Sequence, residues 1–349
     1  MQRVIFRTAL AAAALLALAA PAAAQSDILL RLRSGSPLGD RFRVDSAGGT
    51  VAMGGLGIGI IPQTGAGERM MWYPFRAVFL AGGVNGTQWD DGNLGFYGGA
   101  FGYNTTLKGN YSFVAGYQSS VQQSYGVAMG YTANSNGVGS IAIGYRATAN
   151  SDYSLALGQR ASTNGFDGAI VISDQSSTDS LLASAINQFS VRAAGGYRFY
   201  TTATRTTGVS LNAGGSTWNV ISDRNRKQDF LAVDGEDLLA RLRLVPVTTW
   251  RYRDEVDRSL LHIGPMAQDW QRAFGFGGDG TTINLSDFDG VNLAAIQALA
   301  RRTEALQAEN AALRARVQRL EAGQAENAEL RARLERLEAL LAGAAAAKP

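Results

Sequence analysis

A short motif recurs at a fixed interval in the middle of the chain, and it constrains the fold more than any other feature. Five copies occupy residues 100–103, 114–117, 128–131, 142–145 and 156–159, reading AFGY, VAGY, AMGY, AIGY and ALGQ. Their glycines lie 14 residues apart, and no insertion interrupts the series. A fixed short period predicts a solenoid, in which each coil buries its apolar face only against its neighbours.

Fourteen residues are enough for one coil of two short strands and two turns. A strand rises ~3.3 Å per residue, so each side of the coil would be about five residues long. The segment Ile141-Ala142-Ile143 alternates in size, so it places large side chains on one face and alanine on the other. The small face would let coils or neighbouring chains approach closely. The repeated glycine indicates a turn with positive φ or a close approach between backbones.

The repeat also argues against two functions found on solenoids. A calcium-binding solenoid has nonapeptide repeats with Asp, and a glycosidase needs two facing carboxylates. Asp152 is the only Asp or Glu between Phe96 and Asn164. The segment is therefore expected to be a structural rod without a metal or active site of its own.

In its period and its Ala-x-Gly core, this segment resembles the head of trimeric autotransporter adhesins of the YadA type, over about residues 93–162. The resemblance implies a left-handed parallel β-roll built from three chains. The C-terminal part departs from that family, because the chain ends in a predicted helix rather than in the family's membrane anchor.

The first 24 residues are predicted to be a signal peptide. Arg3 and Arg7 precede an apolar run over residues 8–20, and small residues follow up to Gln25. The run is short for a membrane span, which needs ~20 apolar residues, and no second stretch is long and apolar enough. We therefore expect an exported chain with no transmembrane segment, at the cell surface, associated with the outer membrane, extracellular or in the periplasm.

The rare residue types narrow the possible chemistry. The chain has no Cys and one His, His262, which excludes thiol chemistry, disulfides and metal sites with thiolate or several His ligands. No cofactor and no metal are expected. The formal net charge of +3 falls to +1 without Arg3 and Arg7, too little for a phosphate-tracking surface. Nucleic acid is therefore not expected as a partner.

Of the 32 basic residues only three are Lys, and Lys227 closes the polar run Ser222-Asp223-Arg224-Asn225-Arg226-Lys227. A Ser hydroxyl becomes a good nucleophile when a neighbouring base takes its proton. Lys can be that base if burial favours its neutral form, whereas Arg stays protonated. The spacing alone also fits an ordinary surface loop.

The sequence from this run onward resembles the peptidase S74 domain, the intramolecular chaperone at the C-terminus of phage endosialidase tailspikes and some fibres. The resemblance covers about residues 222–321 and includes Pro246-x-x-x-Trp250-x-Tyr252 and the segment from His262 to Asp269. It implies a homotrimer whose C-terminal domain guides folding of the preceding β-rich part and then cuts itself off.

By position, the resemblance implies that Ser222 is the nucleophile, that Lys227 is the general base and that Ile221–Ser222 is the scissile bond. Asp223 could orient Lys227 or cap the turn. Arg224 and Arg226 could steady the developing oxyanion or only face water.

Four further residues lie in the motifs that carry the resemblance. His262 could support the site or serve as a packing residue. Gln268 could bond backbone in the core. Trp250 and Tyr252 alternate along a predicted strand and are expected in the core.

Residues 298–343 are predicted to form a parallel coiled coil. One seam position recurs every seven residues and holds Leu299, Leu306, Leu313 and Leu320. The second seam position lies four residues later and holds Thr303, Asn310 and Val317. Asn310 in the seam would fix the register. Near Gly323 the pattern slips to Leu330 and Leu334, which indicates a local break in the supercoil. The heptad pattern alone is compatible with a coiled coil of two chains, whereas the resemblance implies three chains.

The chain is thus predicted to be mainly β, with a small α+β chaperone domain and a C-terminal coiled coil. The expected segments are a signal peptide (1–24), a β-rich region (25–92), the β-roll (93–165), a β-rich neck (166–221), the chaperone (222–297), the coiled coil (298–343) and a tail (344–349).

Three functional hypotheses follow. The first is an exported homotrimeric fibre or adhesin, with a host-surface, matrix or glycan ligand, that assembles through its C-terminal domain and then cuts itself. The second keeps this architecture without catalysis, with that domain as a permanent trimerisation clamp. The third is a phage-like glycan-degrading fibre, which the lack of paired carboxylates in the roll disfavours.

Overall fold

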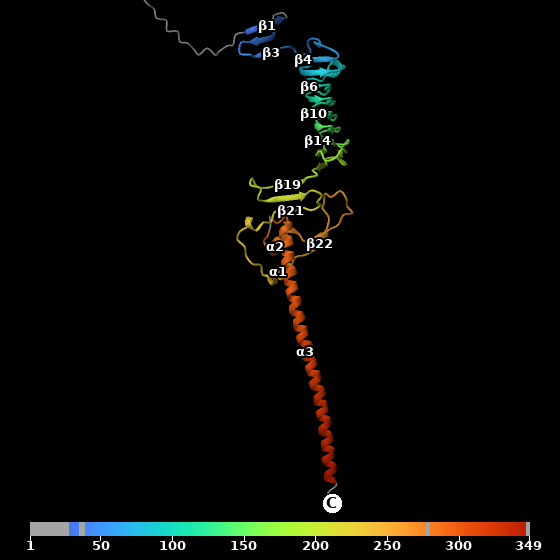
Figure 1. Cartoon of the computed structure of the whole chain (residues 1–349), viewed down its shortest axis with the longest axis vertical. Helices are drawn as coiled ribbons and strands as arrows, with labels where there is room; N and C mark the ends of the chain where they lie inside the picture. The colour runs from blue at the N-terminus through green and yellow to red at the C-terminus, as the bar shows by residue number, and fades with distance from the viewer. Residues whose placement is uncertain (1–27, 35–38, 277–278, 347–349) are drawn as a thin grey trace, which may run out of the picture. The chain divides into compact units, whose positions relative to one another are not determined.

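The chain is mainly β with a smaller C-terminal helical region (Figure 1). The computed structural model describes residues 28–34, 39–276 and 279–346, so the predicted signal peptide lies outside the described residues. The fold divides into two units, one up to Ser222 and one from Asp223 onward.

The first unit begins with a small antiparallel sheet. Strands β1 (Ile28–Ser34), β2 (Gly39–Asp45) and β3 (Thr50–Ala52) lie in the order β1-β2-β3. Leu30 lies opposite Val44 and Leu32 opposite Phe42. The sequence prediction of β structure before the repeats is confirmed here.

The repeats form a β-solenoid of about five regular coils, as the 14-residue period predicts. Each coil contributes one long strand, and these strands are parallel and in register one repeat apart, with Val127 beside Ile141 and Ala128 beside Ala142. The long strands are β6 (Gly99–Tyr103), β8 (Phe113–Tyr117), β10 (Val127–Tyr131), β12 (Ile141–Tyr145) and β14 (Leu155–Gln159).

A second parallel sheet of two-residue strands closes the other side of each coil, in the order β17-β15-β13-β11-β9-β7. Its strands are β7 (Thr106–Leu107), β9 (Ser120–Val121), β11 (Asn134–Ser135), β13 (Thr148–Ala149), β15 (Ala161–Ser162) and β17 (Leu181–Leu182). Each coil therefore has one five-residue side and one short side, whereas the sequence suggested two sides of similar length.

The stack is longer than the five repeats. The antiparallel pair β4 (Gly67–Tyr73) and β5 (Val78–Val84) joins its upper end through β5 and β6. At the other end β16 (Ile170–Ser173) and β18 (Phe189–Arg192) continue the long sheet. These strands lie outside the expected 93–165, because irregular coils keep the pairing without keeping the sequence period.

The interior of the solenoid is narrow, and small residues fill it. Ala128, Ala142 and Ala156 of the long strands are fully buried. From the short side, Ser135 also points inward, and its hydroxyl lies 2.7 Å from the Ser140 hydroxyl and 2.9 Å from the Ser140 carbonyl oxygen. The alanine face therefore packs inside the coil rather than against another chain.

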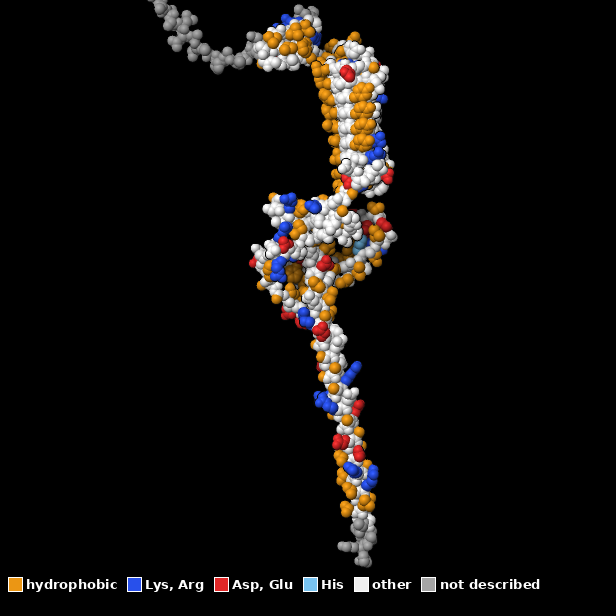
Figure 2. Space-filling model, viewed as in Figure 1, with side chains coloured by type: hydrophobic (Ala, Val, Ile, Leu, Met, Phe, Trp, Pro, Cys, Tyr) orange, Lys and Arg blue, Asp and Glu red, His pale blue; other side chains and the backbone are white. Residues whose placement is uncertain are grey.

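The large residues of the same strands point outward. Val127, Ile141 and Leu155 are half-buried, and Met129 and Ile143 are exposed. Figure 2 shows apolar side chains running in stripes along the stack. The long sheet thus presents an apolar outer surface, which we call the aliphatic stripe (Val127, Met129, Ile141, Ile143, Leu155 and Leu157).

The repeated glycine occupies a position that no other residue fits. Gly144 has φ +132°, and a Cβ atom there would lie 2.8 Å from the carbonyl carbon of Gly158 and closer still to its oxygen. Gly102, Gly116 and Gly130 meet the next coil in the same way. The repeated glycine is therefore required for both reasons predicted from the sequence, a positive φ and a close approach between backbones.

A three-stranded antiparallel sheet follows the solenoid. It consists of β19 (Gly196–Tyr200), β20 (Gly208–Asn212) and β21 (Asn219–Val220), in that order. The prediction of short strands and turns over 166–220 is confirmed by these strands and by β16 to β18.

The second unit has a small core of three helices. Its elements are the short 3-10 helix η2 (Arg224–Arg226), α1 (Gly235–Leu242), β22 (Thr248–Trp250), β23 (His262–Gly264), α2 (Ala267–Phe274) and α3 (Leu285–Ala346). Leu238 and Leu239 of α1, Trp270 of α2 and Val291 of α3 are buried together. Asp234 caps α1 by accepting from the amides of Glu236 and Asp237, and Glu236 pairs with Arg302 of α3.

Helix α3 begins thirteen residues before the expected coiled coil, because its first turns belong to this core. Beyond them the seam leucines, including Leu299, Leu306 and Leu313, are each half or more exposed. Asn310 donates its side-chain amide to the Leu306 carbonyl at 2.8 Å. The predicted helix is confirmed, while its association with other chains stays a prediction.

We predict that Gly144→Ala destabilises the solenoid by at least ~1–3 kcal/mol, because it adds a clash with the Gly158 backbone to the strain of a positive φ. Gly165→Ala is the matched control: its φ is +83° but no atom lies near the added Cβ. Thermal unfolding followed by circular dichroism at one protein concentration checks this. Equal melting temperatures for the two variants would contradict the close-approach argument.

Candidate functional site

The polar run predicted to carry chemistry starts directly after the last strand of the first unit. The Ile221 amide donates to the Gly208 carbonyl at 3.3 Å, and Ile221 is half-buried. Ser222, the next residue, is exposed and ends the first unit. The predicted scissile bond therefore joins an anchored residue to an accessible one.

Local contacts organise the residues between Ser222 and Lys227. Asp223 Oδ1 accepts from the Asn225 amide at 2.9 Å, and its Oδ2 lies 3.5 Å from Arg226 Nε. Asp223 thus caps the short helix η2, which is one of the two roles considered for it. The Arg224 guanidinium lies 5.5 Å from the centre of the Phe230 ring. Both arginines are engaged within the loop itself.

Lys227 follows η2, and its amide donates to the Arg224 carbonyl at 3.2 Å. Its side chain is exposed in the single chain, as that of Ser222 is. A lysine serves as a general base when burial favours its neutral form. The single chain provides no such burial at Lys227.

His262 lies on β23, opposite Trp250 of β22. Its Nε2 lies 3.0 and 3.1 Å from the two carboxylate oxygens of Glu255. Its ring stacks on Trp250, with ring centres 4.7 Å apart, and contacts Tyr252 at 5.6 Å. These contacts make His262 the centre of a small aromatic cluster that holds the β22–β23 hairpin together.

Two expectations for this region are wrong. Gln268 is exposed in the first turn of α2, so it does not lie in the core. Tyr252 follows the end of β22 and is 62% exposed, while Trp250 is half-buried. An open groove of about 740 Å³ lies beside the hairpin, lined by Trp250, Tyr252, Ile263, Gln268 and Phe288.

Sequence reasoning missed Glu255 as the partner of His262 and Phe230 as the partner of Arg224. Glu255 is one of several acidic residues between the two hairpin strands, and no spacing singles it out. Only the antiparallel pairing of Thr248–Trp250 with His262–Gly264 brings the intervening loop back over the imidazole.

Within residues 28–34, 39–276 and 279–346, no three His, Asp or Glu side chains gather as a metal site would require. Where the structure describes the chain, none of its helices combines the length and the apolar character needed to span a bilayer.

Comparison with known proteins identifies two parts of the chain. Residues 222–278 match the model of the endosialidase chaperone family, peptidase S74. Residues 135–161 match the YadA head domain repeat in two copies, within the solenoid. No curated protein and no solved structure was found to match. The chain therefore carries YadA-type adhesin head repeats followed by an endosialidase-type chaperone region, as the two resemblances indicated.

Proposed function

We propose that this protein is an exported homotrimeric fibre or adhesin, displayed at the cell surface or released outside the cell. Its C-terminal region directs assembly of the β-rich part and then cuts the chain between Ile221 and Ser222. The observation that carries this proposal is the match to the endosialidase chaperone family, which begins at residue 222. That is the residue at which a self-cleaving chaperone would have its new N-terminus.

Assembly is supported by apolar surfaces that the single chain leaves uncovered. The aliphatic stripe follows the long sheet of the solenoid, and the leucine seam follows α3. Large contiguous apolar patches are rare on soluble monomers and mark interfaces. Both surfaces are continuous along their elements, so each suits pairing with an identical neighbour in the same register.

The proposed cut follows serine chemistry. Ser222 Oγ attacks the Ile221 carbonyl carbon while Lys227 Nζ accepts the hydroxyl proton. The C–N bond breaks, the proton passes to the departing Ser222 amine, and an ester joins Ile221 to Ser222 Oγ. Water then hydrolyses the ester, which leaves a carboxylate on Ile221 and a free residue 222–349 fragment.

The exposure of Ser222 and Lys227 explains why this reaction would wait for assembly. We propose that a neighbouring chain covers the loop on assembly and removes the water that surrounds both side chains in the single chain. Cleavage would then report that assembly is complete.

We expect the purified wild-type protein to separate on a denaturing gel into two pieces that meet at Ile221–Ser222. Ser222→Ala removes the nucleophile, and Lys227→Arg keeps the charge but supplies no base. Both variants should stay intact over the time in which the wild type is fully cut. N-terminal sequencing of the smaller piece identifies the bond.

Lys108→Arg in the solenoid is the matched control and should be cut like the wild type. If the wild-type protein stays intact, the self-cleavage proposal fails and the C-terminal region acts as a permanent trimerisation clamp. Equal cleavage of all variants would assign the cut to a foreign protease.

We also expect Leu313→Asp to abolish the trimer, because it places a charge in the seam of every chain at a cost of several kcal/mol. Ala315→Asp, two residues away and off the seam, should leave the trimer intact. Light scattering gives the molar mass of each variant and so distinguishes Leu313→Asp from Ala315→Asp. Both are made in the background of Ser222→Ala, so that the chain stays whole. A trimeric Leu313→Asp variant would show that α3 does not hold the assembly.

A further inference from the structure

The groove beside the β22–β23 hairpin has a mainly apolar wall that the single chain leaves in solvent. We call it the hairpin groove, and its apolar wall includes Trp250, Tyr252, Ile263, Leu285 and Phe288. Ile263 is 73% exposed and Leu285 is 76% exposed. Its volume of about 740 Å³ is enough to hold several side chains. Exposed apolar residues that gather around a hollow in this way mark a binding surface.

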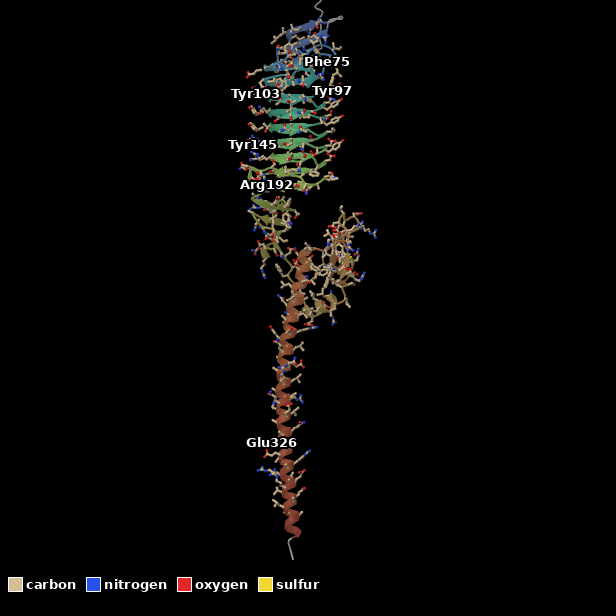
Figure 3. The ribbon with its side chains drawn as sticks, turned by 90° about the vertical axis from the view of Figure 1, so that its right-hand side faces the viewer. Phe75, Tyr97, Tyr103, Tyr145, Arg192 and Glu326 are labelled. Carbon is tan, nitrogen blue, oxygen red and sulfur yellow. The ribbon has the colours of Figure 1, made fainter. Side chains whose placement is uncertain are left out.

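The hairpin groove is a different surface from the leucine seam of α3. Only the beginning of α3 borders the groove, through Leu285 and Phe288. Figure 3 shows Glu326 far along the same helix. A helix rises ~1.5 Å per residue, so Phe288 and Glu326 are ~57 Å apart along its axis. Pairing along the seam therefore does not account for the groove.

The same unit carries an apolar segment that is exposed along its whole length. Residues 230–233, which read FLAV, follow the polar run of the candidate site and belong to no helix or strand. We call them the FLAV segment. Leu231 is 91% exposed and Val233 is 60% exposed. Within residues 223–276 and 279–346, no other run of exposed apolar residues outside the helices and strands is as long.

Contacts at both ends hold the FLAV segment in place. At its start, the Arg224 guanidinium lies 5.5 Å from the centre of the Phe230 ring. Directly after it, Asp234 accepts from two backbone amides of α1 and caps that helix. Leu231 and Val233 lie between these two fixed points and point into solvent. The segment is therefore presented as a short apolar ligand on an anchored backbone.

The charges beside the two surfaces are opposite in sign. Asp229 directly precedes the FLAV segment and is exposed. Among the described residues that line the hairpin groove, Arg251 is the only charged one, and it is exposed as well. An acidic residue beside apolar side chains thus matches a basic residue beside an apolar groove. Such complementarity fixes the register of a contact and disfavours wrong partners.

From this complementarity we infer that the hairpin groove binds the FLAV segment of a neighbouring copy of the chain. Leu231 and Val233 enter the groove, and Asp229 pairs with Arg251. Within one chain the segment and the groove are both exposed, so they do not fill each other. A contact between two different patches of identical chains is heterologous, and three such contacts close into a ring.

The inference rests on the proposed homotrimer and names the surface that covers its candidate site. Phe230 follows Lys227 by three residues, so a groove that holds the FLAV segment brings a neighbouring chain within ~10 Å of that lysine along the chain. The neighbour then removes water from the loop, which favours the neutral form of the lysine. Docking itself does not depend on the cut, so a chain that cannot cleave docks in the same way.

The test is disulfide cross-linking, which the sequence makes unambiguous because the chain has no Cys. Leu231→Cys and Ile263→Cys are introduced together into the full chain, in the background of Ser222→Ala so that it stays whole. Both positions are exposed in the single chain, so the variant should fold. On oxidation it should give a covalent species of three chains on a non-reducing denaturing gel, and either substitution alone should run as one chain.

Leu244→Cys combined with Ile263→Cys is the matched control. Leu244 is 81% exposed and belongs neither to the FLAV segment nor to the lining of the hairpin groove. A thiol at this position is as accessible as one at Leu231 but does not meet the groove of the next copy. The control pair should therefore run as one chain after the same oxidation.

Charge reversal tests the pairing of Asp229 with Arg251. Arg251→Glu, added to the cross-linking variant, should slow the cross-link about 5-fold, the scale of one exposed ion pair. Asp229→Arg added to that variant should restore the rate. The backbone accepts this change, because Asp229 has φ 57° and Arg146 and Arg160 already have φ 54°.

Light scattering before oxidation and circular dichroism report assembly and folding of each sample. A folded trimer that forms no cross-link overturns the docking and leaves the proposed function standing. A folded protein that stays a single chain in solution overturns both. A disulfide within one chain, seen as a single-chain band without a titratable thiol, assigns the groove to the chain's own segment and also overturns the inference.

Discussion

The close approach of backbone to backbone at the repeated glycines is the constraint on which the first unit depends. A side chain at Gly130 or Gly144 would meet the carbonyl of the next coil, so the regular coils stack in register because glycine returns every 14 residues. This fixed return aligns every other position into columns along the solenoid. The buried alanines and the outward aliphatic stripe are both consequences of that register.

A solenoid built in this way is narrow, and a narrow coil buries little apolar area. Its interior holds Ala128, Ala142 and Ser135, while larger side chains such as Ile143 remain at the surface. A growing stack of coils leaves an unpaired strand edge at each end, and such edges promote aggregation. A C-terminal region that gathers the chains first would offset this disadvantage, which gives a physical reason for an endosialidase-type chaperone region after adhesin head repeats.

The regular part of the fold was predictable because every repeat carries the same sequence pattern and therefore forms the same local structure. The period fixes the coil, the glycines fix the contact, and the heptads from Leu299 onward fix a helix. The solenoid ends were not predictable in the same way, since β16 and β18 join the long sheet after irregular coils. At the candidate site, the capping role of Asp223 was within reach of sequence reasoning. The exposure of Gln268 and Tyr252 was not, because the small α+β region offers no repeat against which burial can be judged.

The sequence by itself determined the order of the parts, the coil length, the polar run from Ser222 to Lys227 and the chemistry that the rare Lys and His residues permit. Tertiary structure alone decided which side of each coil faces inward, because that depends on how two strands of unequal length close around a narrow core. It also decided that Glu255 meets His262 and that the Asp152 carboxylate accepts from the Val138 amide one coil away. These pairs are set by strand register and coil stacking, which bring together residues that no local sequence pattern connects.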